Sequence, residues 1–409
     1  MEKKLIENYA KLIVRKGINV QKGQDVIITA NTDQESFVTL LMEECYKRGA
    51  KKITVKWVSD KTSFIKYTYE DEETLSTLPD WKFEEQKEIN KKLPATIYIE
   101  SSDPEALKGL DLNKFSNAQK KIRAAIKPFR DKRENKYQWV IAGAPSKEWA
   151  AKIFPEDTAE DAYEKLWKAI LQTSRALEGN PEENWEKHNA FLKKHYDYLN
   201  SLNLVSLHYS SSNGTDFTVG LNKNIDWLGG GEINHINNTF YNPNIPSEEI
   251  FTSPLKGQAE GIVYSSKPLS FQGQVIENFS VRFEKGRAVE VHAEKNEDFL
   301  KQVIETDEGA SYLGEVALVP FESPVNQTGI LFLSTLYDEN AACHLAFGLG
   351  FTSLIRGYEK MSKEEIESFG INDSALHLDF MIGTEDLSIT GKTDDGKSVE
   401  IFKNGTWAF

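Results

Sequence analysis

The strongest constraint on the fold is a change in the pattern of apolar residues near position 203. Before it, stretches of helical period alternate with short apolar runs that suit buried strands, at residues 25–30, 53–57, 96–99 and 139–142. Such alternation is typical of a parallel α/β sheet. Beyond position 203, short alternating runs are broken by Asn, Gly and Pro, which is typical of antiparallel hairpins. We therefore predict an α/β N-terminal domain and an α+β C-terminal domain with antiparallel hairpins.

Helical patterns set the expected domain limits. Residues 157–177 and 181–202 both have helical period, and Pro181 stands where a first-turn proline is tolerated. The last hairpin signal, Asn404-Gly405, follows an apolar run and ties the C-terminus into a sheet. We expect three parts: an N-terminal domain at 1–180, a bridging helix at 181–203 and a C-terminal domain at 204–409.

Charge and cysteine content exclude several classes of protein. The 409 residues carry 49 basic and 63 acidic side chains, a net charge of −14, which argues against nucleic acid or an anionic membrane as a partner. Cys45 and Cys343 form neither a disulfide framework nor a zinc-binding pair of closely spaced cysteines. No apolar run suits a secretion signal or a membrane span. We expect a cytoplasmic protein.

One basic stretch departs from the acidic average. Eight Lys and Arg residues crowd residues 120–136, with little acid among them. The stretch is either a solvated helix face with a surface loop or a local anion site; the lack of interleaved aromatic residues favours the former.

Two histidine segments have candidate metal-ligand chemistry. His377 and Asp379 lie two residues apart in a strand-like run, so their side chains project from the same face. Imidazole and carboxylate are common ligands of divalent cations, although this tripeptide pattern is also frequent by chance. His344 lies in a small-residue, helix-compatible stretch and is either a ligand or a hydrogen-bonded core histidine. Glu249 and Glu315 precede apolar residues in strand-like runs, where an inward carboxylate is costly unless it is paired or bound to a cation.

Five segments together resemble a known family. They are NIPSEEIFTSP at 244–254, YLGEVALVP at 312–320, LYDENAACHLAFG at 336–348, HLDFMIGTEDLSITG at 377–391 and FKNGTWAF at 402–409. In this order they look like segments of the thermophilic-type metallo-aminopeptidases, the group of aminopeptidase T, aminopeptidase S and aminopeptidase PepS. The resemblance spans nearly the whole chain, and several long motifs in order are more specific than any single tripeptide.

The resemblance implies a metal-binding catalytic C-terminal domain. It implies two divalent metal ions per subunit, which are zinc, cobalt, manganese or magnesium, held by Glu249, Glu315, His344, His377 and Asp379. Glu315 is then the bridging carboxylate. Five ligands with one shared leave open positions for water and substrate. The implied activity is a metal-dependent aminopeptidase that releases single N-terminal residues from peptides with free N-termini, by water that two metals activate. A homodimer is implied as well.

Two further residues are candidates for catalysis. Glu339 is either a general base, an orienting partner of a ligand, or a cap of the following helix. Phe351 stands seven residues after His344, where the family pattern has a tyrosine, so a hydroxyl is missing there. Tyr337 and Tyr358 are the residues that we consider as replacements.

Two other functions stay open at this point. The same ligand set suits a two-metal phosphoesterase or amidohydrolase, and the basic stretch at 120–136 favours a phosphate substrate. A catalytically impaired family member that acts as a binding protein would agree with Phe351.

Overall fold

The computed structural model describes residues 1–409. The chain forms two compact units: unit 1 comprises residues 1–187 and 231–246, and unit 2 comprises residues 188–230 and 247–409. The division at residue 187 falls inside one helix, α9 (Pro181–Ser201). The chain then returns once to unit 1 after residue 230, a detour that the hydropathy pattern does not mark.

Unit 1 contains a five-stranded sheet in which all neighbouring strands are parallel. The strand order is β10-β4-β3-β1-β2. The bounds are β1 (Asp25–Asn31), β2 (Lys52–Val58), β3 (Ala95–Glu100), β4 (Trp139–Gly143) and β10 (Asn244–Ile245). The four strands predicted from apolar runs are confirmed as β1 to β4. A short hairpin adds β8 (Glu232–Ile233) and β9 (Phe240–Tyr241).

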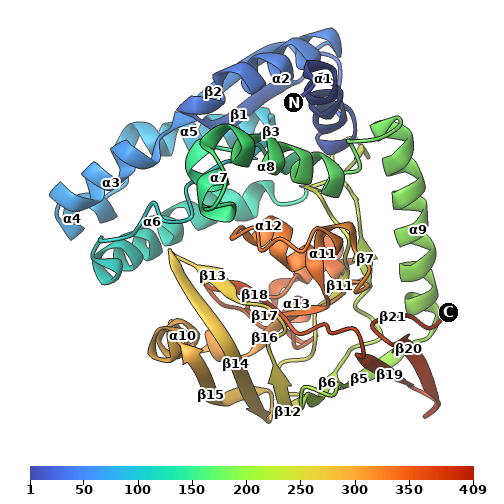
Figure 1. Ribbon diagram of the computed structural model, residues 1–409. Helices are drawn as coiled ribbons and strands as arrows, with labels where there is room; N and C mark the ends of the chain where they lie inside the picture. Colours follow the sequence, from blue (N-terminus) through green and yellow to red (C-terminus); the bar gives the residue numbers. More distant parts are fainter. The chain divides into compact units, whose positions relative to one another are not determined.

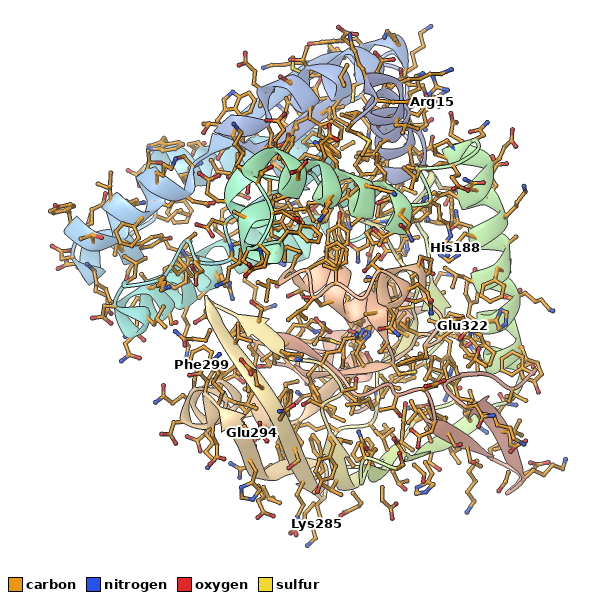
Figure 2. All side chains as sticks on the ribbon, viewed as in Figure 1. Arg15, His188, Lys285, Glu294, Phe299 and Glu322 are labelled. Carbon is orange, nitrogen blue, oxygen red and sulfur yellow. The ribbon has the colours of Figure 1, made fainter.

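Helices connect the strands of unit 1 (Figure 1). Their bounds are α1 (Lys3–Leu12), α2 (Glu35–Lys47), α3 (Asp60–Tyr69), α4 (Glu72–Ser76), α5 (Asp80–Lys92), α6 (Leu112–Arg133), α7 (Lys147–Ile153) and α8 (Ala159–Thr173). Arg15, labelled in Figure 2, follows α1 and ties two helices together. Its Nε donates to Glu44 at 2.7 Å, and its Nη1 donates to Glu182 at 3.0 Å. The basic stretch lies largely in α6, where Ala118 alone is buried, as a solvated helix face requires.

Unit 2 contains two antiparallel sheets. The smaller has the order β18-β17-β16-β11-β7, and the larger begins β13-β14-β12-β6-β5 and continues β19-β20-β21, with β15 paired to β14. The smaller consists of β7 (Leu228–Gly229), β11 (Ile250–Thr252), β16 (Leu313–Leu318), β17 (His344–Gly348) and β18 (His377–Met381). The larger consists of β5 (Leu204–Ser210), β6 (Asp216–Gly220), β12 (Ala259–Tyr264), β13 (Leu269–Phe271), β14 (Gln274–Glu284), β15 (Arg287–Lys295), β19 (Ser388–Thr393), β20 (Ser398–Lys403) and β21 (Thr406–Trp407). The helices are α10 (Glu297–Ile304), α11 (Pro324–Gln327), α12 (Thr335–Asp338) and α13 (Lys363–Glu367).

The hairpins expected beyond residue 203 are present. β14 and β15 turn at Lys285-Gly286, and β20 and β21 turn at Asn404-Gly405. In both turns the two residues have positive φ. Asn and Gly adopt that conformation readily, so they suit the turn at Asn404-Gly405.

The core of unit 2 joins its two sheets. Phe347 on β17 stacks on Phe283 of β14 with ring centroids 6.0 Å apart, and Phe380 on β18 lies 5.8 Å from Phe279. Because side chains alternate along a strand, the residues on either side of Phe347 and Phe380 face away from this core. The side of the smaller sheet that faces away from the core carries the polar residues described next. No helix in residues 1–409 is long and apolar enough to cross a membrane.

Candidate metal centre

Strand register places two carboxylates on either side of one small residue. Ala346 on β17 pairs with Glu315 on β16 and with Asp379 on β18. Residues directly opposite in antiparallel strands point to the same face. The methyl group of Ala346 therefore leaves the space between the two carboxylates open.

The two histidines share that face. His344 precedes Ala346 by two positions, and His377 precedes Asp379 by two, so the period of the strands projects all four side chains to one side. The stretch around His344 is helix-compatible by its sequence, but residues 344–348 form the strand β17, which pairs on both edges. Pairing on both edges outweighs the helical propensity of its alanines.

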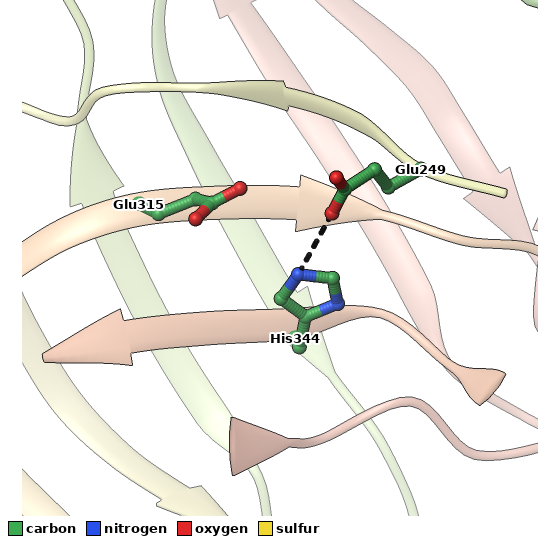
Figure 3. Close-up of side chains that lie close together, drawn as sticks. All are labelled: Glu249, Glu315 and His344. Atoms are coloured by element: carbon green, nitrogen blue, oxygen red, sulfur yellow. Dashed lines mark ion pairs between the residues drawn. The ribbon is translucent and has the colours of Figure 1, made fainter. Parts of the chain in front are cut away.

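The side chains form two clusters with one member in common. Ligand atoms of Glu249, Glu315 and His344 lie within 4.8 Å of one another, as do those of Glu315, His377 and Asp379. In the first, His344 Nε2 lies 3.1 Å from Glu249 Oε2 (Figure 3). In the second, His377 Nε2 lies 3.2 Å from both Glu315 Oε2 and Asp379 Oδ1. Glu315 thus belongs to both groups.

Each ring has its second nitrogen occupied by the backbone. His344 Nδ1 lies 3.2 Å from the carbonyl oxygen of Ala342, and His377 Nδ1 lies 2.9 Å from that of Leu349. An Nδ1–H that donates to a carbonyl leaves the Nε2 lone pair for a cation, an arrangement usual for histidine ligands. His344 Nε2 is buried and, despite its short distance to Glu249, has no partner with hydrogen-bond geometry. The donor set and this orphaned nitrogen fit a bound divalent cation.

The protein's own charges at the centre are strongly interdependent. Burial raises the pKa of Glu315 to about 7, and the charges of Glu249 and Asp379 add to the rise. Burial lowers the pKa of His344, but the neighbouring carboxylates outweigh it and raise the value to about 10. The carboxylates likewise hold the pKa of His377 well above its usual range. So many acids in one buried place require compensating positive charge, which a divalent cation supplies.

The segment that carries Glu249 is positioned by two residues that the sequence analysis missed. Asn340 is fully buried; its Oδ1 accepts from the backbone N–H of Glu248 at 2.6 Å, and its Nδ2 donates to the Leu336 carbonyl at 2.8 Å. His188 Nε2 lies 2.6 Å from the carbonyl oxygen of Ser247. These contacts link segments far apart in sequence, so spacing alone gives no signal for them, although Asn340 does adjoin Glu339.

Glu339 lies beside the clusters. Burial raises the pKa of its carboxyl well above the usual value, and the charges of Asp379 and Glu249 add to the rise. Among the alternatives from the sequence, helix capping is not its role. No backbone N–H donates to its carboxyl, and the residues after it lead into the strand β17.

The aromatic candidates lie in different surroundings. Phe351 packs beside His377 and also contacts Phe251, with centroids 5.3 Å apart. Tyr358 packs against the same small apolar cluster as Phe351. Tyr337 is buried and stacks on Phe332 with centroids 4.6 Å apart.

Comparison with known proteins gives consistent matches over nearly the full chain. Residues 2–407 match the family described as thermophilic metalloprotease (M29). Aminopeptidase AmpS of Bacillus subtilis is 43% identical over 99% of this chain and 98% of its own length. Aminopeptidase PepS of Streptococcus thermophilus is 38% identical over the same shares.

The fold agrees with a solved structure. The wild-type AmpT from Thermus thermophilus superposes with a TM-score of 0.92 at 38% identity, and the match covers 100% of both chains. Such agreement over the whole length leaves no part of either chain outside the shared fold. The chain therefore belongs to the thermophilic metalloprotease family M29, a family of metal-dependent peptide-bond hydrolases.

Proposed function

We propose that the protein is an aminopeptidase that releases single N-terminal residues from peptides, with two divalent cations held by Glu249, Glu315, His344, His377 and Asp379. The observation that carries the proposal is the pair of three-residue clusters that share Glu315. Aminopeptidase names among the relatives support the class of substrate. The experiment below tests which metals support the activity.

The clusters provide the chemistry that peptide hydrolysis needs. Bound there, two divalent cations would polarise the scissile carbonyl and lower the pKa of a water that attacks it. Open positions remain, because each cluster offers three protein ligands. An acid of the centre that is not fully neutralised also attracts the free amino group of a peptide, which accounts for cleavage at the N-terminus.

Glu339 is our candidate for proton transfer. Its carboxyl adjoins the ligands without hydrogen-bonding to either histidine ring, and its one side-chain contact is a long bond from Asn340 Nδ2 at 3.4 Å. The pKa of Glu339 is raised among the protein's own charges, and positive charge at the ligands opposes that rise. Glu339 would take a proton from the attacking water and deliver it to the leaving amino group.

A substrate panel tests the proposal against the phosphoesterase alternative. Unblocked aminoacyl fluorogenic amides, their N-acetylated forms and phosphate esters are assayed with chelator and after zinc, cobalt, manganese or magnesium is added back. We expect the unblocked amides alone to be cleaved, with activity lost in chelator and restored by metal. Equal cleavage of acetylated substrates contradicts single-residue release, and turnover of phosphate esters in place of amides favours the alternative.

The homodimer and the cytoplasmic location stay predictions. Sedimentation velocity of the purified full chain tests the first, because a dimer has twice the monomer mass of 46.4 kDa. Fractionation of cells tests the second.

A further inference from the structure

The parallel sheet of unit 1 has a topological switch point that lies outside the metal centre of unit 2. From β1 the chain moves to β2 on one side, then returns across β1 to form β3 and β4 on the other. In open α/β sheets, ligands bind beyond the carboxyl ends of the strands where the order reverses. Here that place is the end of β1 at Asn31 and the end of β3 at Glu100.

A buried polar atom without a partner lies at this point. Asn31 is 7% exposed; its Nδ2 lies 3.4 Å from Asp60 Oδ2, and its Oδ1 has no hydrogen-bond partner. Buried polar atoms are nearly always paired, so this oxygen at the end of β1 indicates a missing partner.

Carboxylates lie close to the Asn31 amide. Asp60 begins α3, directly after β2, and its Oδ2 accepts the backbone N–H of Asp103 at 3.0 Å. Glu100 ends β3. Burial raises the pKa of its carboxyl to about 7, and the charge of the nearby Asp60 adds to the rise. No basic side chain lies within 4.0 Å of the carboxylates of Asp60, Glu100 and Asp103. Lys61, which follows Asp60 in the chain, is exposed and pairs with Glu148 at 3.4 Å.

We propose that the carboxyl ends of β1 and β3 form a site for a hard divalent cation of the Mg²⁺ type, bound by Asp60, Asp103 and Asn31. The available atoms are oxygens, which Mg²⁺ and Ca²⁺ prefer, and no imidazole or thiolate is among them. No three ligand groups here lie within 4.8 Å of one another, whereas each cluster of unit 2 brings two carboxylates and a histidine within that distance. The ion therefore keeps several of its waters, as Mg²⁺ does in most protein sites.

The site differs from the metal centre in the metals that it selects. Imidazole ligands favour zinc, cobalt and manganese over Mg²⁺, whereas an all-oxygen group does not. The two sites can thus be filled one after the other in the same protein, first the centre with zinc and then this site with Mg²⁺.

Isothermal titration calorimetry with MgCl₂ tests the proposal on the full chain already loaded with zinc, with melting curves in parallel. We expect Mg²⁺ to bind and raise the melting temperature of the wild type, and Asp60→Asn to weaken the binding at least tenfold. Asp25→Asn is the matched control, because Asp25 lies at the opposite end of β1. It should bind Mg²⁺ as the wild type does.

Several results would overturn the proposal. One is the absence of any Mg²⁺-dependent heat or stabilisation in the wild type. Another is binding that survives Asp60→Asn or that disappears with Asp25→Asn. If arginine methyl ester stabilises the wild type in an Asp60-dependent manner and Mg²⁺ or Ca²⁺ does not, the site is one for an organic cation and the assignment to a metal fails.

Discussion

The ring of Phe351 lies with its centroid 5.2 Å from that of His377, and the two planes are inclined by 54°. The position where the family pattern has a tyrosine is thus beside a proposed metal ligand. The Phe351 backbone is held in place as well, because its N–H donates to Ser253 Oγ at 2.7 Å. Phe351 is therefore a fixed neighbour of the centre, and a hydroxyl on its ring is our candidate for the missing donor.

Phe351→Tyr should therefore raise kcat more than it changes KM. A donor that stabilises the developing oxyanion acts mainly in the transition state, and removal of one such donor typically costs about 10²–10³ in kcat. We expect a gain of about tenfold or more on aminoacyl amides, measured by steady-state kinetics, with an unchanged melting temperature because the ring is only partly buried.

Phe251→Tyr is the matched control, since the Phe251 ring contacts that of Phe351 but not that of His377. It should leave kcat close to the wild-type value. An unchanged kcat in a stable Phe351→Tyr protein means that this position has no donor role, and Tyr358 and Tyr337 are then the residues to replace.

Much of the site's local geometry could be predicted from the sequence, but its assembly could not. The period of two in a strand is enough to put His377 and Asp379 on one face. By contrast, the approach of Glu315 depends on the pairing of β16, β17 and β18 around Ala346, which no local pattern specifies. His344 shows the same limit, because the strand that carries it is stabilised by both neighbours rather than by its own propensity.

The shared position of Glu315 predicts how metal content responds to substitution. Glu315→Gln keeps the volume but removes a charge from both clusters, so it should abolish activity and lower the occupancy of both metals. Glu249→Gln affects only the cluster with His344 and should lower the content by about one equivalent per subunit. Elemental analysis of metal-loaded, desalted protein measures both.

Glu248→Gln is the control for this pair, because Glu248 adjoins Glu249 but belongs to neither cluster. It should keep both metals and most of the activity. Full occupancy in Glu315→Gln would refute the bridging role, and an essential Glu248 would mean that the ligand had been placed one residue off.

Asn340 should matter for metal affinity although it is not itself a ligand. Asn340→Ala leaves the buried N–H of Glu248 without its acceptor, which costs about 1–3 kcal/mol of stability. Because Glu249 is the next residue, its carboxylate loses its fixed position, and loss of such a supporting partner typically weakens metal binding by about 10–100-fold. Activity measured against free metal concentration in a metal buffer gives the shift.

Asn326→Ala offers a comparison of the same type, since Asn326 Nδ2 donates to the Phe321 carbonyl at 2.7 Å and Asn326 lies outside both clusters. It should lower the melting temperature without changing the metal dependence. If both variants shift the metal dependence equally, Asn340 acts through general stability and has no positioning role.

Glu100 predicts a pH dependence of stability that is independent of the metal centre. Burial, with a contribution from Asp60, raises its pKa from 4.5 to about 7 in the folded protein. Between these values the folded state binds more protons than the unfolded state, so the free energy of unfolding falls as pH rises through that window and levels off above it. At about 1.4 kcal/mol per pKa unit, the decrease attributable to Glu100 is about 3 kcal/mol.

Glu100→Gln should remove this part of the slope and stabilise the protein at pH 8, which urea unfolding in the presence of chelator measures. Glu84→Gln is the control, because Glu84 is an exposed acid of the same unit, and it should retain the wild-type slope. A wild-type slope in Glu100→Gln would mean that the Glu100 carboxyl is already charged in the fold near pH 5.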